Sequence, residues 1–376
     1  MLRPVSVAIT HPMLDLKSEV QEIWDELQPT IERVLKSGAF VGGPEVEAFE
    51  LEAAHYLGVN HALGLNSGTD ALVLGLEALG VGPGDEVITT PFSFFATSEA
   101  VLRLGAAPVF VDIDDDTLNL DASLLDAAVT DRTKVILPVH IFGLPADMTG
   151  VMDVAGRHGL AVVEDCAQAF GAKHEERRVG GIGAIGAFSF YPTKNLGAYG
   201  DGGLITTNDD EVAAALRALR NHGSSPQEKY LHVGLGHNSR LDAIQAAVLR
   251  IKLAKLDGWD ARRRERASAY RAALSAVPGG DEGLRLPPDS PEHRYHQFTL
   301  RLPPARRAQF ESGLRERGVA FSRFYPSPLT KQPAGADFGL APVAERACER
   351  VISVPIHPWL PDEAIAKVAE AAAAAF

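Results

Sequence analysis

Seven short apolar runs, most of them separated by stretches of helical periodicity, constrain the fold of this chain more than any other feature of its sequence. Strands that alternate with crossover helices form mainly parallel sheets with helices on both faces. A loop joins the last two runs, which allows one antiparallel edge. The sequence therefore predicts an α/β fold with a mainly parallel seven-stranded sheet. The expected strands are residues 61–65, 86–90, 108–111, 134–139, 160–164, 184–190 and 203–206.

Helical patterns fill the intervals between these runs and extend beyond them on both sides. Residues 15–57 have helical periodicity that is interrupted near Gly42-Gly43-Pro44, because glycine and proline break helices. A long helix is expected over residues 241–276. The shorter expected helices are residues 70–79, 96–104, 121–129, 149–158 and 211–221.

The C-terminal part of the chain, from about Pro278 onward, is richer in proline and has fewer strand patterns. Its expected strands are residues 295–302 and 319–322, and its expected helices are residues 304–317, 341–351 and 364–376. We therefore expect two domains. Residues 1–250 form a large domain that includes the N-terminal helices, and residues 251–376 form a smaller α+β domain.

The charge and composition exclude several classes of protein. A net charge of −13 without a basic block disfavours binding to nucleic acid or to an anionic membrane. No stretch approaches the roughly 18 apolar residues of a membrane span. The N-terminal residues lack the apolar run of a secretion signal, and two cysteines, Cys166 and Cys348, are too few for a disulfide framework. These properties favour a cytoplasmic protein.

Several motifs that carry known chemistry are absent. The 12 histidines form neither an HExxH motif nor a cluster with cysteine, so no metal site is expected. The serine-hydrolase motif G-x-S-x-G and the phosphate-loop motif G-x-x-x-x-G-K-[ST] are missing. No G-x-G-x-x-G follows the first run, which disfavours a Rossmann-type dehydrogenase.

Lys194 and Asp165 are the candidate catalytic residues. Lys194 follows an apolar strand in a loop that Pro192 and Gly197 shape, and Asp165 stands at the end of another apolar run, 29 residues earlier. Burial lowers the pKa of an ammonium group, and such a lysine can form a Schiff base with pyridoxal 5′-phosphate. An ionised aspartate would keep the pyridine nitrogen of this cofactor protonated. The alternative role for Asp165 is to cap a helix.

The turn after the first strand is a candidate phosphate site. Residues 66–70 read Asn-Ser-Gly-Thr-Asp and open the next helix, where free N–H groups and the helix dipole attract anions. Gly68 permits close approach of the backbone, and Thr69 adds a hydroxyl group. Ser189 could supply another hydroxyl to the same phosphate. An ordinary capping sequence is the alternative.

Three further residues are candidate cofactor contacts, each with an alternative left open. Gln168 could bind the phenolic oxygen of the cofactor, or it could be a surface residue. Phe94 could stack on the cofactor ring, or it could pack in the core. Asn238 could reach a phosphate, or it could cap the long helix that follows it.

The whole set of motifs, in its order and spacing, resembles the DegT/DnrJ-type family of nucleotide-sugar aminotransferases, which are pyridoxal-phosphate enzymes of fold type I. The resemblance extends from about residue 13 to the C-terminus. It rests on residues 66–72, 82–88, 164–168, 189–194, 200–203, 220–223, 238–242 and 325–329.

The resemblance implies a homodimer whose active sites lie at the subunit interface. It assigns the Schiff base to Lys194, the pyridine contact to Asp165 and the phenolic-oxygen contact to Gln168. The phosphate contacts are assigned to Gly68, Thr69 and Ser189, with Asn238 entering from the partner chain, and the stacking ring is assigned to Phe94. The candidate substrate contacts are Tyr191, Arg240, Tyr325 and Lys331, and for Arg240 and Lys331 simple surface exposure is the alternative.

The implied reaction is a ping-pong transfer of an amino group from L-glutamate to a nucleotide-linked keto-sugar. Lys194 at this position favours transamination, because relatives that dehydrate sugars carry histidine there. The sequence Asn-Ser-Arg-Leu-Asp at residues 238–242 resembles the branch that acts on 3-keto sugars, including uronic acids. The expected product therefore carries its new amine at C3.

Three alternatives remain. One is transamination of another ketone, such as a 4-keto nucleotide sugar, an aminocyclitol ketone or a keto acid. The second is a regulator that binds pyridoxal phosphate without turnover, which the presence of both Lys194 and Asp165 disfavours. The third is the dehydrogenase that the missing glycine motif disfavours. The nucleotide, the stereochemistry of the product and the pathway are not encoded in a recognisable motif.

Overall fold

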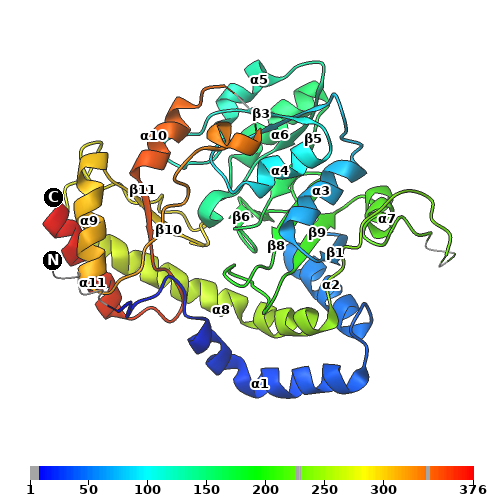
Figure 1. Cartoon of the computed structure of the whole chain (residues 1–376), viewed down its shortest axis with the longest axis horizontal. Coiled ribbons are helices and arrows are strands. Elements are labelled where there is room, and N and C mark those ends of the chain that lie inside the picture. The colour runs from blue at the N-terminus through cyan, green and yellow to red at the C-terminus, as the bar shows by residue number, and fades with distance from the viewer. Residues whose placement is uncertain (1–7, 226–227, 229, 336–338) are drawn as a thin grey trace.

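The computed structural model describes residues 8–225, 228, 230–335 and 339–376. Its central element is a seven-stranded sheet with the order β1-β9-β8-β5-β4-β2-β3 (Figure 1). All seven predicted runs are strands of this sheet, so the predicted α/β class is confirmed. The strands are β1 (His61–Leu65), β2 (Glu86–Thr89), β3 (Ala107–Phe110), β4 (Thr133–Leu137), β5 (Ala161–Asp165), β8 (Ile185–Ser189) and β9 (Gly203–Thr207).

One strand of the sheet runs against the others. β9 pairs antiparallel with both β1 and β8, whereas the pairs from β8 to β3 are parallel. β9 can reverse because a loop, and no crossover helix, connects it to β8. The expected antiparallel strand is therefore β9, which lies next to the edge strand β1 and not at the edge itself.

Helices cover both faces of the sheet. Adjacent strand residues alternate between two cores: Val87 joins the core under α3, α4 and α7, while Ile88 joins the core under α2, α6 and α8. The same alternation holds for Val163 and Val162. The covering helices are α2 (Pro44–Leu57), α3 (Gly68–Ala78), α4 (Ala96–Arg103), α6 (Met148–His158), α7 (Asp210–Leu219) and α8 (Ala243–Leu274).

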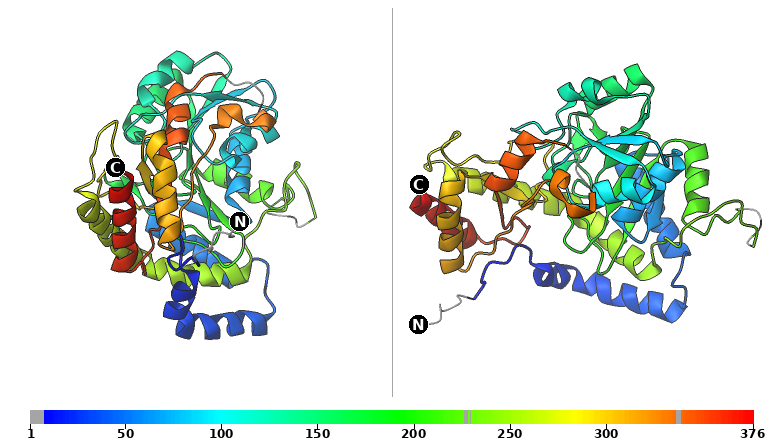
Figure 2. Two further views of the ribbon diagram at one scale, coloured as in Figure 1. Left: turned by 60° about the vertical axis from the view of Figure 1, so that its left-hand side comes forward. Right: turned by 45° about the horizontal axis from the view of Figure 1, so that its top comes forward.

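The N-terminal helical region is divided as predicted. α1 (Leu16–Ser37) lies along α8 on the outside of the molecule (Figures 1 and 2) and is separated from α2 by a glycine pair. Gly42 and Gly43 have φ values of 66° and 79°, which side chains rarely adopt. The prediction of one helix over residues 121–129 is wrong. A 3-10 turn, η1 (Ala122–Leu124), and a four-residue helix, α5 (Leu125–Ala128), occupy this segment instead. The helix ends at Ala128 because the backbone of Val129 is extended.

The C-terminal part has its own hydrophobic cluster, built on a two-stranded antiparallel sheet. The expected strand at residues 319–322 is wrong: Val319 forms only an isolated bridge to His11, and Ser322 forms one to Ser353. The second strand of the two-stranded sheet, β11 (Val351–Val354), does not follow from the sequence pattern, because its first residue, Val351, also completes the helical pattern of residues 341–351. The elements are β10 (Phe298–Arg301), α9 (Pro304–Glu316), α10 (Pro342–Arg350), β11 (Val351–Val354) and α11 (Asp362–Ala375).

The predicted domain boundary at residue 250 stays a prediction, since α8 runs through it without a break. Among the described residues, no helix is both long enough and apolar enough to cross a membrane. The remaining short elements are η2 (Ile141–Gly143), β6 (Lys173–His174), β7 (Arg177–Arg178), η3 (Leu329–Lys331) and η4 (Pro333–Gly335).

Candidate active site

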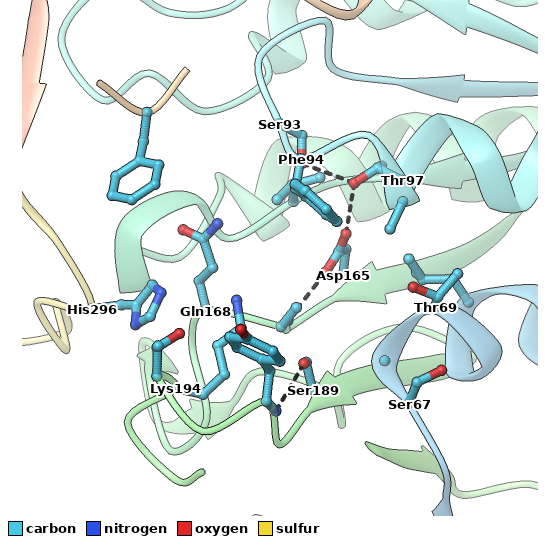
Figure 3. Close-up of a pocket in the computed structure, with 18 of the residues that line it drawn as sticks. Ser67, Thr69, Ser93, Phe94, Thr97, Asp165, Gln168, Ser189, Lys194 and His296 are labelled. Atoms are coloured by element: carbon cyan, nitrogen blue, oxygen red, sulfur yellow. Dashed lines mark hydrogen bonds between the residues drawn. The ribbon is translucent and has the colours of Figure 1, made fainter. Parts of the chain in front are cut away.

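A cavity of about 730 Å³ lies at the carboxyl ends of β5 and β8. Its walls also include the first turn of α3, the loop before α4 and residues 323–325 of the C-terminal part (Figure 3). Ligands of open α/β sheets bind at this edge, and the volume is within the roughly 300–1,000 Å³ of small-molecule sites. The cavity is therefore the candidate active site.

Asp165, the last residue of β5, is only 4% exposed. Its Oδ1 accepts the N–H of Ala167 (3.1 Å), and its Oδ2 accepts the hydroxyl proton of Thr97 (2.9 Å). Because Thr97 gives its proton to Asp165, it accepts a hydrogen bond from Ser93 (2.8 Å). Burial raises the pKa of Asp165, while these hydrogen bonds and the charge of Lys194 oppose the rise. A cation beside this carboxylate would stabilise its ionised form.

Lys194 lies in the loop that joins β8 to β9. Two backbone hydrogen bonds close this loop, from Phe190 N to Gly202 O (2.8 Å) and from Ala198 N to Phe190 O (2.7 Å). In the described part of the chain, the ammonium of Lys194 has no hydrogen-bond or ion-pair partner. Burial lowers the pKa of Lys194 to about 8, although the nearby Asp165 opposes the shift. A substantial fraction of this amine is therefore neutral near pH 8, which a nucleophile or base requires.

The first turn of α3 forms a cradle for an anion. Ser67 caps the helix by accepting the N–H of Asp70 (3.1 Å), while the N–H groups of Gly68 and Thr69 have no acceptor among residues that the structure describes. A Cβ on Gly68 would lie 2.7 Å from the Cβ of Ser189, so only glycine permits this approach. Unpaired N–H groups at a helix N-terminus, next to a serine hydroxyl, suit a phosphate.

Gln168 and Tyr325 form a polar contact in the cavity wall. Gln168 accepts the N–H of Phe142 (2.7 Å) and donates to the phenolic oxygen of Tyr325 (3.0 Å). It is 7% exposed, which excludes the surface alternative. Phe94 is 61% exposed beside the cavity, with its ring centroid 6.4 Å from that of Tyr325, so the core-packing alternative is wrong.

Three predicted residues do not line this cavity. Arg240 donates to Asn221 (2.8 Å) and to Asn238 (2.5 Å), and it lines a separate cavity with Arg217 and Arg220. Lys331 pairs with Glu345 (2.6 Å) at the surface. The capping alternative for Asn238 is wrong, because Asp242 caps α8. The predicted residues that the cavity does bring together are Gly68, Thr69, Phe94, Asp165, Gln168, Ser189, Tyr191, Lys194 and Tyr325.

One buried group has the composition of a metal site. Ligand atoms of His140, Glu164 and Cys166 lie within 4.8 Å of one another. Hydrogen bonds explain the arrangement: His140 Nδ1 accepts the N–H of Ala146 (3.0 Å), so its Nε2 donates to Glu164 (3.2 Å). Glu164 also accepts three backbone N–H groups near Gly180. Burial opposes ionisation, but these donors prevail and lower the pKa of Glu164, so a charged carboxylate needs no metal here.

Two residues that line the cavity, Thr97 and His296, and the hydrogen-bond partner of His296, Asn195, were not predicted from the sequence. Thr97 could have been identified, because it stands in the first turn of the helix that follows a parallel strand, where ligands gather. His296 and Asn195 could not, since His296 comes from the C-terminal part and meets Asn195 only through tertiary packing (3.2 Å).

A lysine loop, a strand-end carboxylate and a helix-terminal phosphate cradle at one edge of such a sheet define the pyridoxal-phosphate-dependent transferases of fold type I. Sequence comparison identifies the group within this class. Residues 21–373 match the DegT/DnrJ/EryC1/StrS aminotransferase family, and the chain belongs to this family.

Two relatives show how names vary within the family. A UDP-N-acetyl-3-dehydro-α-D-glucosamine 3-aminotransferase of Acidithiobacillus ferrooxidans is 46% identical over 362 residues, which cover 95% of this chain and 96% of the relative. A protein of Geobacillus stearothermophilus, named a pleiotropic regulatory protein, is 45% identical over 367 residues, which cover 96% and 98%.

Two solved structures match over nearly the whole chain. DesV of Streptomyces venezuelae, in complex with a ketimine intermediate, has a TM-score of 0.91 and 46% identity and covers 96% of this chain and 97% of its own. NtdA of Bacillus subtilis, with bound cofactor PMP, has a TM-score of 0.91 and 31% identity, covering 99% and 86%. The predicted family, fold type, aminotransferase class and pyridoxal phosphate cofactor are thus confirmed.

Proposed function

We propose that the protein moves an amino group from L-glutamate to C3 of a nucleotide-linked 3-keto sugar, a hexose or a uronic acid. The observation that carries the proposal is the cavity in which the amine of Lys194, without a partner among the described residues, and the buried carboxylate of Asp165 lie together at the strand ends. The names of relatives such as the Acidithiobacillus 3-aminotransferase support the sugar and the position.

The residues of the cavity fit pyridoxal phosphate. When bound, the cofactor supplies an electron sink for the carbon that loses its proton. Lys194 would hold its aldehyde carbon, and Asp165 would keep its ring nitrogen protonated. Gln168 would bind its phenolic oxygen, and Phe94 would stack on its ring. Its phosphate would be bound by Gly68, Thr69 and Ser189.

Lys194 would also move the proton of the reaction. When it is not holding the cofactor, its Nζ would act as the base that takes the proton from the donor Cα and as the acid that returns it. The reverse sequence loads the amine on the keto-sugar. A pKa of about 8 suits both directions, because the amine is neither fully protonated nor too weakly basic near neutral pH.

Loading of the cofactor should depend on pH in a defined direction. Only the neutral amine of Lys194 attacks the aldehyde, so the reconstitution rate of the apoenzyme should rise about tenfold per pH unit below 8 and level off above it. Stopped-flow absorbance between pH 6 and 9 measures this rate. A rate still rising tenfold per unit at pH 9 would show an ordinary, unshifted lysine.

The reaction is tested with purified enzyme, L-glutamate and a panel of keto compounds. 2-Oxoglutarate should form with a nucleotide-linked 3-keto sugar, and NMR of the product should place the amine on C3. An amine on C4 contradicts the assigned position, and turnover of an aminocyclitol ketone alone contradicts the sugar.

We further propose a homodimer with shared active sites. Asn238 and Arg240 lie outside the cavity of their own chain, and Arg240 has no carboxylate partner in the described residues. Val41 lines the same cavity as Arg240 and is 66% exposed, and the loop before Asn238 exposes Val233 (69%) and Leu235 (92%). If two chains paired through the surface that carries Val41, Val233 and Leu235, these apolar side chains would be buried. The same pairing would bring Asn238 and Arg240 to the cavity of the partner chain.

Mixing two inactive variants tests the shared site. A hybrid of one Lys194→Ala chain and one Arg240→Ala chain would contain one intact site if Arg240 acts across the interface. Randomly mixed chains should then recover about a quarter of the wild-type activity, since about half of the dimers are hybrids with one working site. If Arg240 acts within its own chain, the mixture will show only the mean activity of the two variants.

A regulator that binds the cofactor without turnover is a second candidate, which the name of the Geobacillus relative favours. It predicts cofactor at Lys194 but no 2-oxoglutarate with any acceptor. A cytoplasmic location, which the two free cysteines favour, is part of the main proposal.

A further inference from the structure

A buried chain of polar groups leads from α8 to the cavity. It begins at Asp260, which is 3% exposed, and passes through Asn195 to His296. Arg294 lies 3.5 Å from Asp260 Oδ2 and balances its charge. Burial raises the pKa of Asp260 to about 6, against the opposing charges of Arg294 and Arg263, so this carboxylate is mainly ionised at neutral pH.

The hydrogen bonds of Asn195 fix the orientation of its amide. Its Nδ2 donates to the carbonyl oxygen of Arg294 (2.9 Å) and to Oδ1 of Asp260 (3.3 Å). Both of these groups only accept, so the amide cannot be turned around. The remaining atom, Oδ1 of Asn195, can only accept, and it lies 3.2 Å from Nδ1 of His296.

His296 is therefore held in one tautomer. Its Nδ1 carries the proton and donates to Asn195, so its Nε2 has a free lone pair. Burial and the charge of Lys194 lower the pKa of His296 well below its usual value, so the ring stays neutral. Nε2 has no partner among the described residues, and the ring lines the cavity beside Gln168 and Lys194 (Figure 3).

A fixed acceptor at this place distinguishes the two substrates of the proposed function. Apart from the amino group that reacts, glutamate carries only carboxylates, which offer no proton to Nε2 at neutral pH. A sugar carries hydroxyl or amide N–H groups next to the reacting carbon, and each of these can donate. On this basis, which rests on the proposed function, we infer that His296 Nε2 accepts a hydrogen bond from the sugar, and that Asp260 and Asn195 are positioning residues that hold it in the accepting tautomer.

The test compares two amino donors in single turnovers of the holoenzyme. Each donor, L-glutamate or a UDP-linked 3-amino hexose, converts the lysine-bound cofactor to its amine form, and absorbance follows both. His296→Leu should slow the reaction of the amino sugar about tenfold or more and change that of glutamate less than about threefold. His296→Gln, whose amide oxygen can accept, should recover part of the loss.

The outcomes separate this inference from the proposed function. Equal loss with both donors in His296→Leu would mean that His296 has only a structural role and would overturn the inference, as would no loss with either. If the wild-type holoenzyme reacts with neither donor, the proposed function fails instead. A second measurement uses ¹⁵N-histidine NMR of the wild type, with His296→Gln for assignment: a proton on Nε2 at neutral pH also overturns the inference.

Discussion

Replacing Lys194 by alanine is expected to abolish amino transfer, with a loss of at least about 10³-fold in turnover. The variant removes both the covalent attachment point of the cofactor and the group that moves the proton. Because the ammonium of Lys194 has no partner among the described residues, its removal should leave folding intact. Turnover is measured as 2-oxoglutarate formed from glutamate, and folding is measured by the melting temperature of the apoenzyme.

Lys36→Ala is the matched control for this variant. Lys36 lies in α1, its side chain is 75% exposed and it forms an ion pair with Glu32 one turn away, so its removal should not change turnover. Addition of a small primary amine should restore part of the activity of Lys194→Ala, since a free amine can carry the proton. The account is wrong if Lys194→Ala turns over both substrates at the wild-type rate.

Replacing Asp165 by asparagine is expected to slow turnover by about 10²-fold or more while the cofactor still attaches to Lys194. The amide has the same shape: its oxygen can accept the N–H of Ala167, and its NH2 can donate to Thr97, whose hydroxyl then donates to Ser93. It lacks the charge that keeps the ring nitrogen protonated. The absorbance of the lysine-bound cofactor and the rate of its reaction with glutamate are the two measurements.

Asp165→Asn should lower the turnover without lowering the melting temperature of the apoenzyme. Burial raises the pKa of Asp165, so its ionised form costs free energy of folding at neutral pH in the apoenzyme. Apo Asp165→Asn should therefore melt at the same temperature as the wild type or higher. Asp85, before β2 at the opposite end of the sheet, is the contrasting case: the N–H of Gly82 and Lys134 lower the pKa of its carboxyl, so Asp85→Asn should melt lower without losing turnover. A variant that melts lower and loses activity in proportion would indicate a structural role for Asp165.

The sheet was predictable because its strands are buried on both faces. Residues 135–139, Val-Ile-Leu-Pro-Val, are apolar throughout, and a short apolar run between two helical patterns is typical of a strand in a parallel sheet. The chemistry at the strand ends was predictable for the same reason. Once Asp165 and Ser189 are placed at strand ends, parallel pairing of β5 and β8 brings them to one edge of the sheet.

The failures occur where tertiary contacts override the local pattern. Residues 319–322 are apolar enough for a strand, but Val319 meets His11 near the N-terminus through a single bridge, which no local pattern encodes. His296 joins the site because its backbone N–H binds the carbonyl of Phe142, 154 residues earlier. The tautomer of His296 depends in turn on Asn195 and Asp260, which come from two other segments.

The covalent attachment of the cofactor is the claim that the rest of the account requires, and it can be measured directly. The protein is purified without added cofactor, reduced with borohydride, digested and mapped by mass spectrometry. The account predicts one pyridoxyl group per chain, on Lys194. A pyridoxyl group on another lysine, such as the buried Lys252, or an active enzyme with no modified lysine, would contradict it.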